Sequence, residues 1–408
     1  MHTAPNAHGK HSVGFRPRAL FLYNVLMQES WQDGMLDGFS SVLVDRCRQA
    51  GGVWQLPGGS IILPEVFGFC RGVKRALAML DHEVSRHAQQ GGRLFLLGEI
   101  IHNPWVNDYF HRRGVTILDA DDRRQLESLI TPEDCAIIPA FGVPLPVEHR
   151  LQQIGCRIVD TSCGDVRRLW KWAQEAAQRG FGVMIFGRAD HDETVVTRSR
   201  LEACGGSYLV VNKLSQVDFF CDLITGRRDR GEFAELLKRS ASNTTELAVF
   251  ERLAQVSQTT MLYDETMLVQ ERLRGAFGER FGAAEMSERL QLQPTVCRAT
   301  QARQSAAVKL CQQHPDVVIV VGGFGSSNTR HLFELAGSFA PAYFIEDASA
   351  IVDANTLRTL DHQTSQPATV TGWLPAHRPV RVAVLSGASS PEIVVGEVLR
   401  KLAEFLEG

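Results

Sequence analysis

The chain has 408 residues, 44% of them apolar and 22% charged, which is enough to bury the cores of two or three globular domains. A net charge of −3 excludes the strongly basic surface of a nucleic-acid-binding or membrane-surface protein. No apolar run reaches the roughly 18 residues of a membrane span, and the first residues lack the apolar core of a secretory signal. We therefore expect a cytoplasmic protein. A plastid location is the alternative, because no acidic residue precedes Glu29, as in a transit peptide.

Nine cysteines are scattered along the chain without a CxxC pair. This distribution argues against both a disulfide framework and a zinc finger. Six of them lie in mixed surroundings typical of small buried hydrophobic residues. The other three, Cys70, Cys163 and Cys297, share a local pattern.

In chain order, each of these three cysteines ends an apolar run, opens a helical pattern and leads to a short apolar strand. After Cys70 the apolar residues recur at helical spacing, at Val73, Ala76, Leu77, Leu80 and Val84. The distances from each cysteine to the glycine that closes its strand are 28, 24 and 25 residues, ending at Gly98, Gly187 and Gly322. The sequence therefore predicts an internal triplicate.

Each predicted unit is a cysteine, a crossover helix, a strand and a polar loop, so the fold class is α/β. Because ligands bind at the carboxyl ends of strands in open α/β sheets, each unit presents its cysteine and its loop on one side. Three units around a pseudo-three-fold axis bring the cysteines together. A helix N-terminus favours a thiolate, and three thiolates without a fourth suit an iron–sulfur cluster with one open iron. The alternative is three ordinary buried cysteines.

The polar loops carry complementary chemistry. The first contains His102, the second His191 and Glu193, and the third the run Ser326, Ser327 and Asn328. Imidazole, hydroxyl and amide groups bind phosphate, and a carboxyl group supplies protons. Taken singly, such residues are more often solvated or cap a helix. No Walker A or GxGxxG sequence supports nucleotide binding.

These motifs resemble the IspH (LytB) family, 4-hydroxy-3-methylbut-2-enyl diphosphate reductase, and most closely its plant and cyanobacterial branch. The resemblance runs from about Ile61 to the C-terminus, through "GFCRGVKRA", "GEIIHNPWVN", "DTSCGDV", "DHDET", "SQTTML", "VCRATQARQ", "GGFGSSNTRHL" and "SGASSPE". It implies a trefoil of three pseudo-symmetric α/β domains around a central [4Fe–4S] cluster.

The resemblance also implies the roles of the site residues. The cluster ligands are Cys70, Cys163 and Cys297. The diphosphate site comprises His102, His191, Ser326, Ser327, Asn328 and Ser389, and the catalytic residues near the hydroxyl carbon are Glu193 and Thr259. The implied reaction removes the substrate hydroxyl with two electrons and two protons, giving isopentenyl and dimethylallyl diphosphate. The implied electron donor is ferredoxin or flavodoxin.

Two departures from the family pattern stand near the site. Typical bacterial members carry a histidine where this chain has Phe141, and a proline where it has Gly164. For Ser389, the alternative to a substrate contact is a capping box with Glu392, since Pro391 suits a first helical turn.

The expected domains are an N-terminal accessory helical segment, residues 1–60, then α/β domains at 61–162, 163–296 and 297–390, and a C-terminal helix at 391–408. An insertion with a solvated charge run is expected near residues 217–246 of the second domain. Two other functions remain open. One is another three-cysteine cluster dehydratase such as a quinolinate synthase-like enzyme, and the other is a non-catalytic cluster-bearing sensor or carrier.

Overall fold

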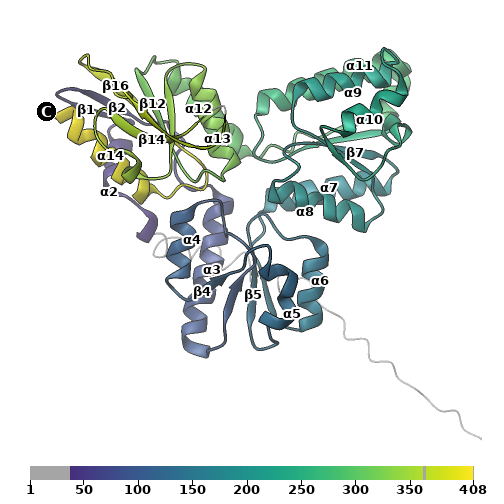
Figure 1. The fold of residues 1–408 in the computed structure, drawn as a ribbon, viewed down its shortest axis with the longest axis horizontal. Coiled ribbons are helices and arrows are strands. Elements are labelled where there is room, and N and C mark those ends of the chain that lie inside the picture. The colour runs from purple at the N-terminus through teal and green to yellow at the C-terminus, as the bar shows by residue number, and fades with distance from the viewer. Residues whose placement is uncertain (1–36, 362–363, 408) are drawn as a thin grey trace, which may run out of the picture. The chain divides into compact units, whose positions relative to one another are not determined.

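The computed structural model describes residues 37–361 and 364–407. Within residues 39–408, which form one compact unit, three sheets each carry their own set of helices (Figure 1). The expectation of an N-terminal transit peptide lies outside the described residues. Among the helices of the described part, none is both long and apolar enough to cross a membrane.

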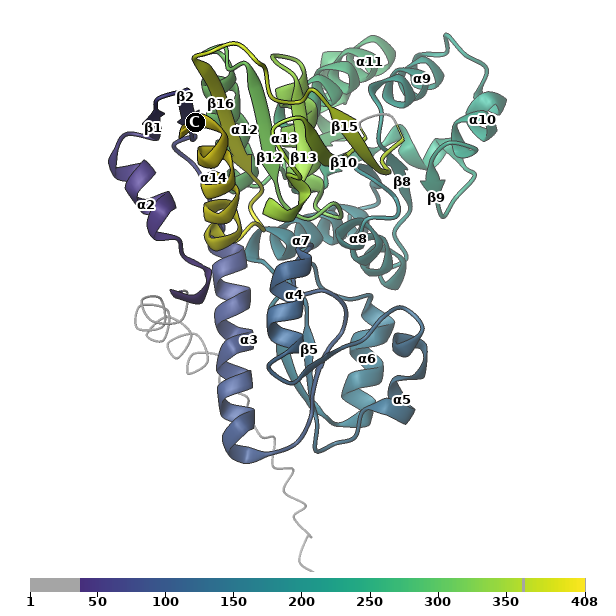
Figure 2. The same cartoon turned by 60° about the vertical axis from the view of Figure 1, so that its left-hand side comes forward.

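The first sheet is wholly parallel, in the order β4-β3-β5-β6. Its central strands are buried on both faces, as expected when helices cover a parallel sheet. Figure 2 shows α3 on one side of this sheet and α5 and α6 on the other. The strands are β3 (Leu94–Leu96), β4 (Val115–Ile117), β5 (Cys135–Ile138) and β6 (Arg157–Asp160), and the helices are α3 (Arg71–Gln90), α4 (Pro104–His111), α5 (Leu126–Leu129) and α6 (Leu145–Ile154).

The second sheet has the order β11-β10-β7-β8-β9, parallel except for the short edge strand β9. The expected insertion near residues 217–246 supplies that edge strand. Its charge run is exposed, with Arg227 and Arg230 paired to acidic side chains, while Phe220 and Phe233 join the core. The strands are β7 (Gly182–Phe186), β8 (Tyr208–Val211), β9 (Ala241–Ser242), β10 (Leu253–Ser257) and β11 (Leu290–Leu292), and the helices are α7 (Gly164–Gln178), α8 (Asp192–Ala203), α9 (Leu214–Thr225), α10 (Phe233–Leu237) and α11 (Tyr263–Arg289).

The third sheet joins segments from both ends of the chain, in the order β1-β2-β16-β12-β13. Beside it lies the antiparallel hairpin of β14 and β15. The strands are β1 (Val53–Leu56), β2 (Gly59–Ile62), β12 (Val317–Val321), β13 (Ala342–Ile345), β14 (Thr356–Leu360), β15 (Pro367–Thr371) and β16 (Val380–Ser386), and the helices are α2 (Val42–Gln49), α12 (Arg298–Cys311), α13 (Ser327–Gly337) and α14 (Glu392–Glu407).

The expectation that residues 1–60 form an accessory helical segment is wrong for their described part. Only α2 is a longer helix there, and β1 and β2 form a hairpin whose second strand pairs in parallel with β16. The turn lies at Pro57 and Gly58, and a Cβ on Gly59, the first residue of β2, would lie 1.9 Å from the carbonyl oxygen of Val380. Glycine is therefore required for β2 to enter the sheet.

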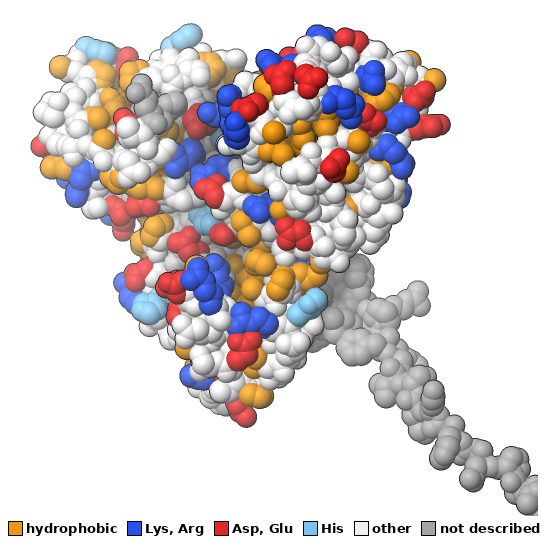
Figure 3. All heavy atoms as spheres, turned by 45° about the vertical axis from the view of Figure 1, so that its right-hand side comes forward, with side chains coloured by type: hydrophobic (Ala, Val, Ile, Leu, Met, Phe, Trp, Pro, Cys, Tyr) orange, Lys and Arg blue, Asp and Glu red, His pale blue; other side chains and the backbone are white. Residues whose placement is uncertain are grey.

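The predicted triplicate is confirmed at the level of secondary structure. Helices α3, α7 and α12 begin directly after the three cysteines, and each closing glycine follows β3, β7 or β12. Charged side chains of both signs are interspersed over the face seen in Figure 3, as expected for a chain with a small net charge.

Candidate active site

The three cysteines occupy the same structural position, the N-cap of a helix with extended backbone. The Sγ atom of Cys70 accepts a hydrogen bond from the amide of Val73, and that of Cys297 accepts one from the amide of Thr300, both at 3.4 Å. Capping by sulfur orients the thiols of Cys70 and Cys297 toward the free amides of the helix start, where negative charge is favoured, whereas the thiol of Cys163 makes no capping hydrogen bond.

Glycine at position 72 lets two of these helix starts meet. A Cβ at Gly72 would lie 2.7 Å from the Sγ atom of Cys163 and 3.8 Å from that of Cys70. Any larger side chain would occupy the space between the two sulfurs, so steric exclusion explains why position 72 is a glycine.

Burial has the largest effect on the pKa values of Cys163 and Cys297 in the metal-free chain. It raises the pKa of Cys163, and it raises the pKa of Cys297 to about 11. In the metal-free chain, burial therefore outweighs the favourable effect that the helix N-terminus has on the thiolate form of these two cysteines. A bound metal cation reverses this balance, because it deprotonates a coordinating thiol outright.

A buried cation lies beside two of the thiols. Arg303 is 5% exposed, and its guanidinium donates to the carbonyl oxygens of Gly68 and Ala299. Burial lowers the pKa of Arg303, and the neighbouring Cys70 and Cys297 partly offset that effect. Arg303 was not among the predicted site residues, although it stands six residues after Cys297 in "VCRATQARQ".

All eleven predicted site residues line one cavity of about 100 Å³. The three sheets contribute to it through their loops and helix starts. The nine other lining residues are Gly72, Val73, Ile101, Ala140, Phe141, Val166, Thr260, Thr300 and Ala388. A larger open groove of about 770 Å³, between α11, α12 and α13, contains none of the eleven, so size alone does not locate the chemistry.

Glu193 is a buried carboxyl group held by Thr259. Its side chain is 2% exposed, and it accepts hydrogen bonds from the Thr259 amide at 2.7 Å and from the Thr259 hydroxyl at 2.5 Å. Burial raises the pKa of Glu193 to about 7, although the two bonds from Thr259 act in the opposite direction. A carboxylic acid that retains its proton near neutral pH suits general acid catalysis.

The two predicted histidines lie edge to face, with ring centroids 5.5 Å apart. Burial, then the charges of His102 and Arg188, lower the pKa of His191 to about 3, so its imidazole is neutral at pH 7. Its Nδ1 accepts the Glu193 amide at 3.2 Å, which leaves the proton on Nε2. His191 is therefore a neutral hydrogen-bond donor in the ligand-free chain.

Phe141, which replaces the histidine of typical bacterial members, stacks on His102. The ring centroids are 4.2 Å apart and the planes differ by 10°. The Nδ1–H group of His102 donates to the Glu99 carboxylate at 2.9 Å, while Nε2 is buried without a hydrogen-bond partner. Phe141 therefore orients the imidazole without competing for its polar atoms.

The third loop places polar groups at the start of α13. Ser326 is the N-cap, and its Oγ atom accepts from the amide of Thr329 at 3.3 Å. Asn328 is 4% exposed, yet neither Oδ1 nor Nδ2 has a hydrogen-bond partner. Since buried polar groups are nearly always paired, an orphaned amide in a cavity points to a polar ligand.

Ser389 joins this cluster, and its side chain does not form the alternative capping box with Glu392. Its hydroxyl donates to the Ser326 hydroxyl at 3.2 Å, whereas the carboxylate of Glu392 pairs with Arg48 at 2.7 Å. Thus Ser389 lies with the third loop, which is the alternative favoured by the family resemblance.

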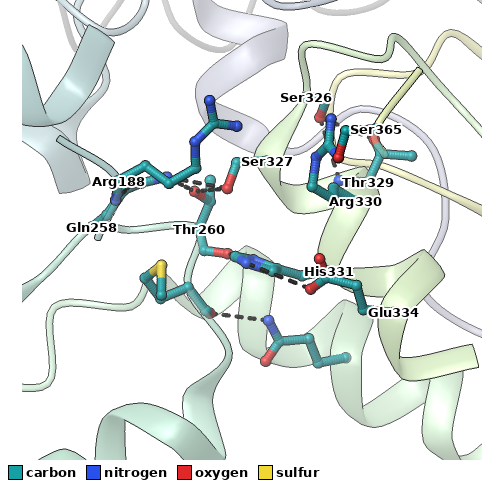
Figure 4. A network of polar contacts seen from close by, with 12 residues as sticks. Arg188, Gln258, Thr260, Ser326, Ser327, Thr329, Arg330, His331, Glu334 and Ser365 are labelled. Carbon is teal, nitrogen blue, oxygen red and sulfur yellow. Dashed lines mark hydrogen bonds and ion pairs between the residues drawn. The ribbon is translucent and has the colours of Figure 1, made fainter. Parts of the chain in front are cut away.

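A network behind the cavity fixes Ser327 (Figure 4). The Ser327 hydroxyl is bonded by the Gln258 amide at 3.1 Å and by the Thr260 hydroxyl at 3.0 Å, and His331 bonds the Thr260 carbonyl at 2.7 Å. Gln258 and Thr260 flank Thr259 in "SQTTML". Neither of the two was among the predicted site residues.

Two relatives of known name cover most of this chain. A 4-hydroxy-3-methylbut-2-enyl diphosphate reductase of Thermosynechococcus vestitus is 34% identical over 367 residues, 89% of each chain. A protein of the same name from Gloeobacter violaceus is 33% identical over 381 residues, covering 92% of this chain and 89% of the relative.

A solved structure shows the fold. The E-1-hydroxy-2-methyl-but-2-enyl-4-diphosphate reductase of Plasmodium falciparum superposes with a TM-score of 0.61 at 20% identity, covering 85% of this chain and 88% of its own. The fold is thus the expected trefoil of α/β units. A family model described as LytB protein matches residues 61–403, and the chain therefore belongs to the LytB family.

Proposed function

We propose that this protein reduces 4-hydroxy-3-methylbut-2-enyl diphosphate to isopentenyl and dimethylallyl diphosphate, in the methylerythritol phosphate route to isoprenoids. The carbon–oxygen bond of the hydroxyl breaks, a carbon–hydrogen bond forms, and two electrons and two protons are consumed as water leaves. The observation that carries the proposal is the shared cavity, in which three thiols, a protonated carboxyl and an unpaired amide converge.

The residues present fit a [4Fe–4S] cluster held by Cys70, Cys163 and Cys297. These three are the cysteines that line the cavity in the described part of the chain, and three thiolates without a fourth suit a cluster with one iron free of cysteine. When bound, the cluster supplies the electrons and one iron without a cysteine ligand. The buried Arg303 offsets part of the negative charge of the thiolates.

The diphosphate is bound by His102, His191, Ser326, Ser327, Asn328 and Ser389. The first amides of α13 have no carbonyl partner within the helix and attract an anion. Asn328 gains the partners that it lacks in the free protein. The Nε2 proton of His191 is donated to a phosphate oxygen, and the arriving negative charge favours protonation of His191.

Glu193 delivers the proton that leaves with the hydroxyl oxygen. Thr259, hydrogen-bonded to both carboxyl oxygens through its amide and hydroxyl, relays this proton and keeps the carboxyl in one orientation. Because burial raises the pKa of Glu193 to about 7, the carboxyl group can still carry a proton near neutral pH and transfer it to the leaving hydroxyl.

We propose ferredoxin or flavodoxin as the electron donor, and a cytoplasmic location with the plastid as the alternative. We propose that residues 61–162, 163–296 and 297–390 approximate the domains, with β1, β2 and α14 assigned to the last of them because they join or cover its sheet.

The test is anaerobic purification with reconstitution, followed by iron and sulfide analysis and an assay with the hydroxylated diphosphate and reduced methyl viologen. We expect four irons per chain and viologen oxidation that depends on the diphosphate. A protein that binds the cluster but never oxidises viologen with this substrate would instead be a sensor or carrier. A protein that binds zinc and no iron would exclude the cluster.

A further inference from the structure

A second hollow reaches one of the three thiols from outside the active-site cavity. It has a volume of about 240 Å³ and lies between the start of α7, the start of α12 and the segment before Cys297. Cys297 is the one described residue that lines both this hollow and the active-site cavity. The sulfur-bearing residue therefore separates the substrate space from an open surface.

The wall of this hollow combines aromatic and cationic side chains. Trp172 and Tyr263 are half-buried in it, and Arg168 and Arg298 stand exposed at its rim. Arg168 forms an ion pair with Asp165 at 3.0 Å, whereas Arg298 forms no ion pair within the described residues. The net charge of the lining is thus positive, on a chain whose total charge is −3.

An acidic groove borders this basic hollow. Tyr263 and Gln301 line both spaces, and beyond them the groove of about 770 Å³ carries Asp264, Glu265 and Glu334. An acidic protein would be attracted to the arginine side and repelled from the groove. Such a change of sign across a short distance orients a partner as well as attracting it.

We infer that this hollow is the docking surface for an acidic, single-electron carrier protein whose redox centre lies near its own surface. The inference rests on the proposed function, which requires two electrons from outside. Electron transfer between proteins declines steeply with distance, and Cys297 is the ligand residue exposed to this hollow. Two carriers are each oxidised by one electron in turn. Their two electrons, with two protons, break the carbon–oxygen bond, form a carbon–hydrogen bond and release water.

Charge reversal at the rim tests this docking surface. Arg168→Glu and Arg298→Glu are compared with wild type for turnover driven by a reduced plant-type [2Fe–2S] ferredoxin and for turnover driven by reduced methyl viologen. Arg124→Glu is the matched control. Its side chain is 78% exposed against 76% for Arg168, and each arginine pairs with an aspartate three residues earlier.

We expect both rim variants to lose at least about tenfold in kcat/KM for ferredoxin and to keep viologen turnover within about twofold. Raised salt should lower the kcat/KM for ferredoxin in the wild type and should change it less in the rim variants. Arg124→Glu should match wild type with both donors. Unchanged ferredoxin kinetics in the rim variants, or equal losses with both donors, would overturn the docking proposal.

Cross-linking tests docking without any turnover. Lys171 lies one turn after Arg168 on α7, and its amine can be joined to a carrier carboxylate by a carbodiimide. We expect the ferredoxin cross-link at Lys171 and its loss in Arg168→Glu. A cross-link at Lys309, in the acidic groove, with none at Lys171 would overturn the proposal. If wild type lacks viologen turnover, the proposed function fails while this measurement still decides docking.

Discussion

Replacing Glu193 by glutamine removes the acidic proton but keeps the size and shape of the side chain. Glutamine can still accept the Thr259 amide hydrogen bond through its carbonyl oxygen and meet the Thr259 hydroxyl with its amide. The variant should therefore fold, bind the cluster and bind the diphosphate. It has no acidic proton to transfer, so the chemical step alone is affected.

The expected loss in turnover follows from general acid catalysis, which typically contributes about 10²–10⁴ in rate, or about 3–5 kcal/mol. We expect kcat to fall by at least about a hundredfold while the substrate affinity stays within a few-fold. Because the pKa of Glu193 is about 7, the wild-type rate should decline as the pH rises above about 7, and this limb should be missing from the residual rate of the variant.

The same substitution should stabilise the metal-free protein at high pH. The pKa of Glu193 rises from 4.5 to about 7 on folding, so the folded chain binds this proton more tightly than the unfolded chain. Its contribution is therefore fully present below about pH 4.5 and is lost as the pH rises through about 7. Above pH 7 the loss amounts to about 3 kcal/mol, which glutamine avoids.

Two assays check these expectations. Steady-state kinetics with reduced methyl viologen measure kcat and its pH profile, and urea unfolding of the apoprotein at several pH values measures the free energy of unfolding. Near-normal turnover in Glu193→Gln would refute the assignment of the acid. A stability difference that does not grow between pH 5 and pH 8 would refute the burial argument behind its pKa.

Three further outcomes are expected from the site. Cys163→Ser should lose the cluster, seen as iron content and visible absorption after anaerobic reconstitution, whereas Cys204→Ser should keep both. Asn328→Ala should weaken substrate binding by about 1.5–3 kcal/mol, seen as a raised KM, and should not destabilise the free protein, because its amide has no partner there; loss of the cluster would contradict this role. Phe141→Leu removes the stacking on His102 and should raise KM by roughly two- to tenfold, with kcat nearly unchanged; an unaltered KM would show that the stack does not orient the imidazole.

The sequence by itself determined the local structure around the site. The helix starts after Cys70, Cys163 and Cys297, the glycine that follows each strand, and the polar loops were all predictable, because caps, turns and helical periodicity depend on residues only a few positions apart. The family resemblance then named eleven site residues, and every one of them lines the same cavity.

Only the tertiary structure decided which segments that are distant in the sequence contact one another. It assigned β1 and β2 to the sheet of β16, turned Glu392 to Arg48, and placed Arg303 beside two thiols. It also buried Cys297, which raises the pKa of this thiol to about 11 although it stands at a helix N-terminus. Burial and electrostatic interactions are summed over contacts between residues far apart in the chain, so no local pattern determines them.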